Sequence, residues 1–302
     1  MEMNGPLVTV GVPVYNGERY LAECIESLLG QTFSDFVLLI SDNASTDGTG
    51  EICRGFVERD PRVRYVRNER NIGMYPNFNV LLRAVESKYF KLANADDYWD
   101  RTMLEKCVAV LESDPSLAVC YPRCTLIDET TGTQTRYQHP LHVLEENPKL
   151  RFNRVLDELR LVNQLQGVTR TDVLKQTPFF EHPFADCIVL AEISLYGKIY
   201  ELPEFLYYRR LHPDSSSWKR NDPRHQARRL FSEGTQHFDW PAWKFHLALL
   251  DRVRRSPIAL RDRVSIEANL VRRMVWSRRE LVEECVRWTM QRSTLFSNLG
   301  RN

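Results

Sequence analysis

The sequence lacks long apolar runs. No stretch of its 302 residues approaches the roughly eighteen apolar residues that a membrane-spanning helix needs. The first residues, MEMNGPLVTVGVPVYNG, contain no basic region followed by a long apolar run, so we expect no signal peptide. The seven cysteines are scattered and form no C-x-x-C pair. Reduced, mostly buried thiols in a cytoplasmic protein therefore fit better than a disulfide framework.

Glycine-rich phosphate-binding loops are also missing. Neither G-x-G-x-x-G nor G-x-x-x-x-G-K-[ST] occurs, which argues against a dinucleotide-binding or P-loop protein. A sugar nucleotidyltransferase needs a basic, glycine-rich loop after its first strand for the incoming triphosphate. The corresponding loop here, PVYNGERYL, has one glycine and no lysine. That enzyme class remains a weaker alternative.

Charge is distributed unevenly along the chain. Residues 1–218 contain 23 Lys/Arg and 31 Asp/Glu, whereas residues 219–302 contain 18 and 9. The polar stretch HPDSSS predicts a boundary near 218, and the sequence from 223 onward has a helical pattern. Two interpretations of these basic helices stay open: they pack on the acidic body, or residues 223–292, with Trp240, Trp243, Trp276 and Trp288, form a dimer or bind anionic lipid at the inner face of a membrane. No nucleic-acid-binding motif accompanies the basic residues, so we expect no nucleic-acid partner.

Apolar, β-branched runs alternate with amphipathic segments in the first 128 residues. Strands are predicted at 6–15, at 36–49 (which ends in a polar loop), and at 63–68, 88–94 and 117–128. Helices are predicted at 18–31, 49–60, 75–86, 100–114, 170–176 and 184–197. Residues 129–165 show no clear pattern, and YELPEFLYYRRLHPDSSSWKR reads as a short strand followed by a polar loop. This order predicts an α/β fold with a mostly parallel sheet flanked by helices.

Three polar clusters follow predicted strands: YNGE after the first, SDNASTDGT after the second and NADD after the fourth. Ligands of such sheets bind beyond the carboxyl ends of the strands. The adjacent Asp96 and Asp97 repel each other, and a divalent cation would offset that repulsion. Mg²⁺ or Mn²⁺ would share these carboxylates with a substrate phosphate. Alternatively, Asp96 is a turn residue and Asp97 caps the following helix.

The other two clusters suit a nucleotide. Asp42 and Asn43 offer carboxylate and amide groups that could accept from a base N–H or bond a ribose hydroxyl. Pro13, Val14 and Tyr15 form an apolar and aromatic rim on which a base could lie. A simple Asx turn and a plain strand-to-helix connection are the structural alternatives.

The ordered set VPVYN, SDNASTDGT, RNIGMYPNFN, NADDYW, FADCIVLAEISLYGKI and ELPEFLYYRRLHPDSSS resembles the family 2 inverting glycosyltransferases with the GT-A fold. The resemblance covers about residues 6–218. It implies a nucleotide-binding part at about 1–128 and an acceptor-binding part at about 129–218. The basic helical region at 219–302 lies outside the resemblance and is expected to be a separate part. The resemblance further implies metal-dependent transfer of a sugar from a nucleoside diphosphate donor to a saccharide, lipid-linked or small-molecule hydroxyl. A UDP or dTDP donor is expected in preference to GDP, because a small base suits the pocket of Tyr15 and Asp42.

The resemblance also assigns residues. Nucleotide-binding residues would be Pro13, Val14, Tyr15, Glu18, Asp42, Asn71, Gly73 and Asn79, with Asp96 on the ribose or sugar. Asp97 and His212 would bind Mn²⁺ or Mg²⁺, Arg210 would contact the diphosphate, and Asp186 would be the catalytic base. Without the resemblance, Asp186 reads as a helix N-cap and His212 as an ordinary loop histidine.

Two positions depart from the family pattern. Asn94 stands where an aspartate is common, and Ala185 replaces a glutamate that often helps to position the acceptor. An active enzyme with altered acceptor recognition is expected. A catalytically degenerate nucleotide-sugar-binding protein is the main alternative.

Overall fold

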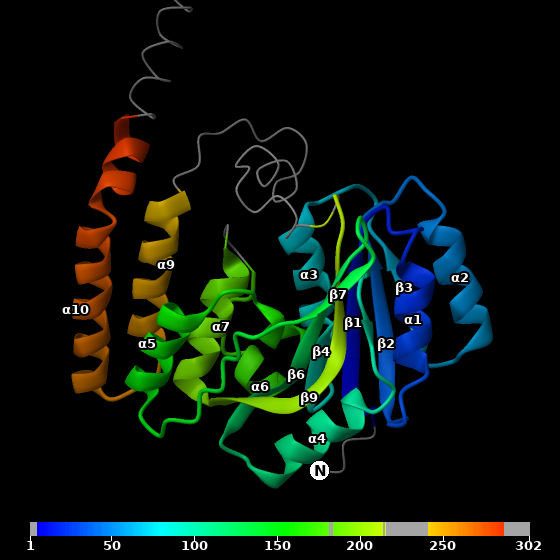
Figure 1. The fold of residues 1–302 in the computed structure, drawn as a ribbon, viewed down its shortest axis with the longest axis horizontal. Coiled ribbons are helices and arrows are strands. Elements are labelled where there is room, and N and C mark those ends of the chain that lie inside the picture. Colours follow the sequence, from blue (N-terminus) through cyan, green and yellow to red (C-terminus); the bar gives the residue numbers. More distant parts are fainter. Residues whose placement is uncertain (1–4, 181–183, 214, 216–240, 287–302) are drawn as a thin grey trace, which may run out of the picture.

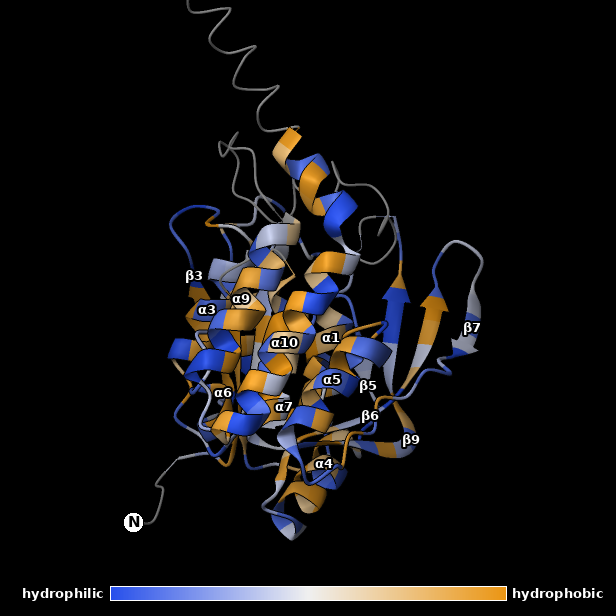
Figure 2. Ribbon diagram, turned by 90° about the vertical axis from the view of Figure 1, so that its left-hand side faces the viewer, coloured by the Kyte–Doolittle hydropathy of each residue, from blue (hydrophilic) through white to orange (hydrophobic). Residues whose placement is uncertain are grey.

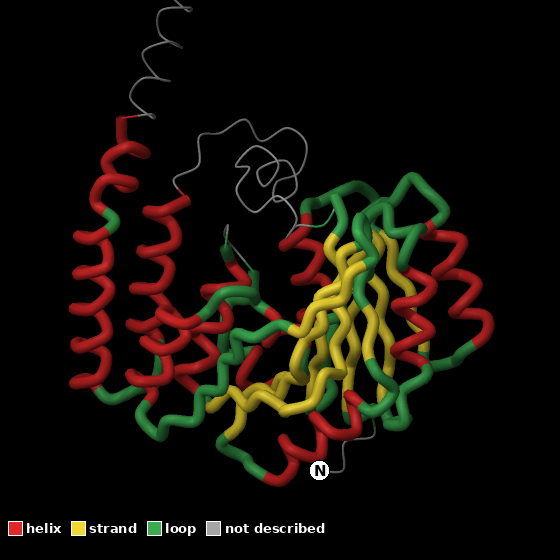
Figure 3. The backbone as a smooth tube through the Cα atoms, viewed as in Figure 1, coloured by secondary structure: helices red, strands yellow, loops and turns green. Residues whose placement is uncertain are grey.

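The computed structural model describes residues 5–180, 184–213, 215 and 241–286 (Figures 1 and 3). The strands are β1 (Val8–Val14), β2 (Phe36–Asp42), β3 (Val63–Arg67), β4 (Tyr89–Leu92), β5 (Tyr98–Trp99), β6 (Leu117–Asp128), β7 (Thr133–Arg136), β8 (Val168–Arg170) and β9 (Lys198–Leu211). The helices are α1 (Leu21–Leu29), α2 (Thr49–Arg59), α3 (Met74–Arg83), α4 (Met103–Ser113), α5 (Pro148–Glu158), the 3₁₀ turn η1 (Asn163–Gln166), α6 (Thr171–Leu174), α7 (Ala185–Tyr196), α9 (Pro241–Arg255) and α10 (Leu260–Trp276).

The strands form one mixed sheet in the order β3-β2-β1-β4-β8-β6-β9-β5, with β7 paired to β6. The four strands β3, β2, β1 and β4 are parallel to their neighbours. Beyond β4 the sheet is mixed, because β8 is antiparallel to both β4 and β6 while β6 and β9 are parallel. The predicted α/β class with flanking helices is confirmed, and the parallel part coincides with the strands that precede the polar clusters.

Burial patterns explain why these segments form these elements. Every residue of β1, VTVGVPV, is buried, as expected of a central parallel strand covered on both faces. In α1 the buried residues are spaced three or four apart, so one face of the helix packs on the sheet. Two apolar cores result, one with side chains of α1, α2 and α4 and one with side chains of α3, α5 and α7.

The second half of the chain departs most from expectation. Residues 129–165, for which no elements were predicted, contain β7, α5 and η1. The side chain of Asn147 caps α5 by accepting from the amide of Lys149 at 2.8 Å, and Pro148 follows at the first helical position. The strand predicted at the start of YELPEFLYYRRLHPDSSSWKR is confirmed but is not short: β9 has 14 residues and ends at Leu211. It is long because it pairs along β6 and then with β5.

The C-terminal helices pack on the body. α9 contacts α7, and α10 contacts both α9 and α5. Buried Leu249, Val253, Ile266 and Leu270 belong to the same apolar core as Ile193 of α7. Packing on the body, the first of the two interpretations, is therefore observed for α9 and α10. The boundary predicted near 218, like Trp240 and Trp288, lies outside the described residues.

A buried ion pair joins α9 to the body. Arg252 Nε lies 3.5 Å from Glu192 Oε2 of α7, and the two side chains are 4% and 2% exposed. Removing one partner of a buried pair costs about 3–5 kcal/mol. We expect Glu192→Ala to lower the free energy of unfolding, measured by denaturant titration, by about that amount. Arg255→Ala, which breaks an exposed pair with Asp251, is the control and should cost less than about 1 kcal/mol. Equal losses would show that the buried pair does not anchor α9.

Candidate active site

The loops that follow β1 and β2 are cross-linked into one unit. The amides of Asn16 and Gly17 donate to the hydroxyls of Ser45 and Thr49 at 2.9 and 2.8 Å. In return, the carboxylate of Glu18 accepts from the amide of Gly48 at 2.7 Å. Glu18 therefore positions the neighbouring loop. Among the residues predicted for base binding, Pro13 and Val14 are buried in β1, whereas the ring of Tyr15 is 49% exposed.

Asp42 lies fully buried beneath these loops. Its carboxylate accepts from the Ser45 amide at 2.8 Å, the Tyr65 hydroxyl at 2.7 Å and Arg67 Nη1 at 2.7 Å. Burial raises the pKa of the Asp42 carboxyl, but the hydrogen bonds from Ser45 and Tyr65 outweigh it and hold the pKa below its ordinary value. Both oxygens already have protein donors, so Asp42 supports the loop and Arg67. The sequence analysis missed Tyr65 and Arg67, although their alternation in VRYVR places them on one side of β3.

The turn of Asn71 and Gly73, predicted to bind the nucleotide, lies against the second loop. The Asn43 amide nitrogen donates to Asn71 Oδ1 at 2.8 Å and to the Gly73 carbonyl at 3.2 Å. Gly73 has φ 92°, a conformation that favours glycine. Asn79 behaves differently: it is 7% exposed and pairs with the backbone of Phe180 through two hydrogen bonds of 2.9 and 3.1 Å. It therefore fixes the segment before α7.

The two acids of NADD point in different directions. Asp97 is 1% exposed, and its oxygens accept from Tyr207 Oη at 2.6 Å, Asn94 Nδ2 at 3.0 Å and the amide of Arg210 at 2.9 Å. The side chain of Asp96 is 32% exposed, and its Oδ2 lies 3.1 Å from His212 Nε2. The predicted metal ligand Asp97 is thus enclosed by the protein, whereas Asp96, predicted for the sugar, is the acid that reaches solvent beside His212.

Burial shifts the pKa values of two groups below the NADD loop. It raises the pKa of Asp97 to about 7, and the charge of Asp96 adds to that effect. Lys91 of β4, which the sequence analysis missed, is fully buried and donates to the Gln166 carbonyl at 2.8 Å, with its ammonium 3.8 Å from the Trp99 ring centroid. Burial lowers the pKa of Lys91 to about 7. Gln166 in turn accepts from the Asn94 amide at 3.2 Å, so Lys91 supports this loop through η1.

Arg210 is a support for the same loop. Its guanidinium, 5% exposed, donates to the Asp96 carbonyl at 2.7 Å and pairs with Glu129 at 3.2 Å and Glu23 at 2.5 Å. The rings of Tyr20 and Tyr98 lie 5.1 and 4.7 Å from it. β9 therefore brings Arg210, together with Tyr207 and the following His212, to the acidic pair. Two carboxylates already share the positive charge of Arg210.

Asp186 is the second residue of α7, and its Oδ1 accepts from the amide of Cys187 at 3.0 Å. Tyr75 of α3 lies next to it: burial raises the pKa of Tyr75 well above its ordinary value, and the charge of Asp186 adds to this. α3 begins directly after Gly73 and, through Asn79, fixes the segment before α7. This helix therefore links the Asn71–Gly73 turn to the start of α7.

Two donor atoms could hold a metal. Asp96 Oδ2 and His212 Nε2 are adjacent, one oxygen and one nitrogen. Among the described residues no group of three or more His, Cys, Asp and Glu could hold a metal ion. A divalent ion at this pair would take its other ligands from water and substrate phosphate, which is the usual pattern for Mg²⁺ and Mn²⁺. The residues present fit such an ion.

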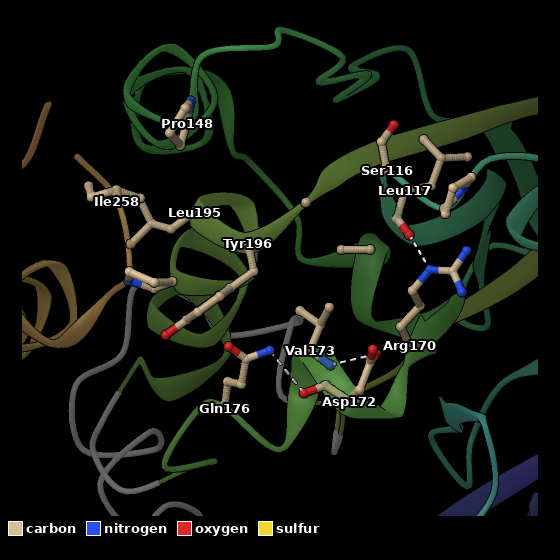
Figure 4. A pocket seen from close by; sticks show the side chains of 14 residues that line it. Ser116, Leu117, Pro148, Arg170, Asp172, Val173, Gln176, Leu195, Tyr196 and Ile258 are labelled. Carbon is tan, nitrogen blue, oxygen red and sulfur yellow. Dashed lines mark hydrogen bonds between the residues drawn. The ribbon is translucent and has the colours of Figure 1, made fainter. Parts of the chain in front are cut away.

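A separate hollow of about 530 Å³ contains none of the predicted site residues (Figure 4). Arg170 lines it and pairs with Tyr89 at the first residue of β4, so the hollow lies at the amino end of that strand, opposite the NADD loop. The Arg170 guanidinium donates to the Leu117 and Asp114 carbonyls at 2.7 and 3.1 Å. It serves as a brace between β8 and β6, and no ligand role follows from it.

Comparison with known proteins agrees with this geometry. The model of the family described as Glycosyl transferase family 2 matches residues 9–176. An uncharacterized glycosyltransferase of Haemophilus influenzae is 28% identical over 71% of this chain and 68% of its own length. Chondroitin synthase of Escherichia coli is 27% identical over 72% of this chain but only 31% of its own length, so the chain spans about a third of that relative.

Solved structures share the fold. S. aureus TarS 1–349 in complex with UDP-GlcNAc has a TM-score of 0.65 at 18% identity, covering 92% of this chain and 79% of that one. Mannosyltransferase PcManGT from Pyrobaculum calidifontis in complex with GDP-Man and Mn²⁺ has a TM-score of 0.52 at 16% identity, covering 99% of this chain and 80% of that one. These likenesses confirm the GT-A-like fold, and the family model matches more than half of the chain. The chain therefore belongs to glycosyl transferase family 2 and is a glycosyltransferase.

Proposed function

We propose that the chain transfers a sugar from a nucleoside diphosphate donor to an acceptor hydroxyl, with inversion and with Mn²⁺ or Mg²⁺ bound. The observation that carries this proposal is the Asp96–His212 pair beyond the carboxyl end of β4. It lies beside the first loop, because the Tyr20 ring is 4.9 Å from His212. The same loop carries the exposed ring of Tyr15, on which a base would stack. A UDP or dTDP donor is favoured, since a small pyrimidine suits the rim above Asp42.

The metal role falls to Asp96 and His212 in this proposal, with Asp97 as the buried support. A bound divalent ion would compensate the charge of the departing diphosphate. Arg210 holds the backbone of Asp96. The departure at Asn94 fits an active enzyme, because its amide donates to Asp97. An aspartate there would add a third negative charge beside a buried carboxylate.

Asp186 is proposed as the general base. It takes the proton of the acceptor hydroxyl while that oxygen forms its bond to the anomeric carbon, and the bond from that carbon to the diphosphate breaks on the opposite side. One displacement of this kind inverts the anomeric centre. Ala185, 2% exposed, offers no side-chain polar group to the acceptor. The acceptor class therefore stays open among saccharides, lipid-linked sugars and small molecules.

We also propose a cytoplasmic location, which the state of the cysteines supports. All seven cysteines are free thiols, and five of them are buried, in line with a cytoplasmic location. No helix in the described part of the chain is long and apolar enough to cross a membrane.

Calorimetric titration of the intact chain with UDP, dTDP and GDP, each with and without Mn²⁺, tests the proposal. We expect UDP or dTDP to bind at least about tenfold more tightly when Mn²⁺ is present, because Asp96 and His212 would hold an ion whose charge would offset that of the diphosphate. UMP is the control, since it lacks the second phosphate and should respond little to Mn²⁺. Binding of no nucleotide, or binding that Mn²⁺ leaves unchanged, would overturn the metal-dependent mechanism.

A further inference from the structure

One face of α10 is covered by exposed aliphatic side chains. The stripe consists of Leu260 (70% exposed), Val264 (57%), Val271 (52%), Val275 (54%), Val282 (58%) and Val286 (44%). It starts on α10 and continues on the helical residues 278–286 that follow the turn at Ser277. Within α10 the spacings of four and seven residues place Leu260, Val264, Val271 and Val275 on one side of the helix, and Val282 and Val286, four apart, share one side of the helical residues 278–286. Figure 2 faces α10 and shows apolar segments alternating with polar ones along its length.

This clustering is unusual for the molecule. Of the 14 exposed large apolar side chains among the described residues, eight lie in 241–286: the six of the stripe, Leu247 and Trp276. Single exposed apolar residues are normal on protein surfaces, but a contiguous patch indicates an interaction site. The inner face of α10 is already used, because Ile266 and Leu270 are fully buried against the body. The stripe is thus an apolar face in addition to the one that the fold requires.

The charges around the stripe indicate what covers it. Seven basic residues of 241–286 are exposed, namely Lys244, Arg254, Arg255, Arg261, Arg272, Arg278 and Arg279, and only Glu280 and Glu283 are exposed acids. Arg254 and Arg255 pair with the partly exposed Glu267 and Asp251, so the positive charge beside the stripe comes mainly from the arginines of its own helices, Arg261, Arg272, Arg278 and Arg279. A second copy seated on this face would bring two basic surfaces together, at an electrostatic cost. An anionic lipid surface would instead neutralise the arginines while the stripe enters the acyl boundary.

The aromatic residue at the end of α10 fits the same occupant. Trp276 is 65% exposed, and the guanidinium of Arg272 lies 5.2 Å from its ring centroid. Tryptophan is favoured at the boundary between water and lipid, and arginine can lay its apolar stem along that boundary while its charge stays in the headgroups. We propose that the stripe, with the exposed arginines beside it, binds the surface of membranes that contain anionic phospholipid.

Vesicle flotation of the intact chain tests this. One vesicle population is phosphatidylcholine alone, and the other is an equal mixture of phosphatidylcholine and phosphatidylglycerol. We expect binding to the mixed vesicles that weakens as salt is raised. We expect Val271→Asp/Val275→Asp to lower this binding at least about tenfold. Val57→Asp is the matched control, since Val57 is a 41% exposed valine on the surface of α2, a helix far from α10 (Figure 1).

The outcomes are distinct. Failure to float with mixed vesicles, equal flotation with neutral vesicles, or an equal loss in the α2 control variant would each overturn the proposal. Light scattering of the wild type and the double variant completes the test: a dimer in the wild type that the double variant dissociates would assign the stripe to a second copy instead. The proposed transfer site does not include this face of α10. The vesicle experiment and the calorimetric titration with UDP therefore test the two proposals independently.

Discussion

Asp186→Asn is expected to lower the rate of nucleoside diphosphate release from the sugar donor by roughly 10²–10⁴-fold, with binding of the nucleotide itself nearly unchanged. An amide keeps the size and one acceptor oxygen of the carboxylate but cannot take a proton from the acceptor hydroxyl. Because the change affects the transition state and not the bound donor, the loss should appear in kcat. The measurement is steady-state kinetics with the donor that the calorimetric titrations identify.

The chain offers a close control for the structural role of Asp186. Asp172 is likewise the second residue of its helix, α6, and its Oδ1 accepts from the amide of the next residue, Val173, at 2.8 Å. If Asp186 only stabilises the start of α7, then Asp172→Asn and Asp186→Asn should lower the free energy of unfolding by similar amounts. Neither change should then alter kcat. A kcat for Asp186→Asn within about threefold of wild type would therefore contradict the assignment of the general base.

The first half of the fold was predictable because its signals are local. β1 and β2 read as apolar runs, β3 combines valine and tyrosine with arginine, and β4 is largely aromatic and apolar. The helices between them carry buried residues at helical spacing, so the order of elements defines a parallel sheet. The second half depends on distant partners. α5 buries only Arg151, Phe152 and Val155 among its 11 residues, which leaves little apolar periodicity to detect. The segment LYYRRL of β9 carries tyrosines and arginines because it pairs with β6 and with β5, next to the acidic loop.

Dependence on distant partners also explains which features of the site could not be predicted. The sequence singled out the acidic pair and the loop of Tyr15 because each follows a predicted strand, and the resemblance added the Asn71–Gly73 turn. It could not decide which of two adjacent acids lies inside. That choice is made by β9, whose Tyr207 and Arg210 enclose Asp97 from more than one hundred positions away along the chain. The support that Lys91 gives to the NADD loop could not be predicted either, because Lys91 lies in a strand whose other residues are apolar.

Asp96→Asn is expected to remove the Mn²⁺ dependence of nucleotide binding. Asp96 contributes the exposed carboxylate of the pair with His212, and an amide oxygen is a much weaker ligand for a hard cation. We expect a loss of about 100-fold or more in affinity for Mn²⁺ in the presence of UDP, measured by calorimetry. The variant should unfold at the same denaturant concentration as the wild type, since the side chain of Asp96 is partly exposed and its main structural contact, from Arg210, is to its backbone carbonyl.

Asp97→Asn is the variant that decides between the two acids. Its carboxylate accepts hydrogen bonds from Tyr207, Asn94 and the amide of Arg210, and the NH₂ group of an asparagine would face at least one of these donors. A buried donor facing a donor leaves polar groups unsatisfied, which costs about 1–3 kcal/mol in the free energy of unfolding. Nucleotide binding by the folded variant should still increase with Mn²⁺, because Asp96 and His212 are unchanged. The opposite pattern, in which Asp97→Asn is stable but insensitive to Mn²⁺ while Asp96→Asn responds normally, would return the metal to Asp97. It would also require the loop to open when the donor binds, because Asp97 is only 1% exposed.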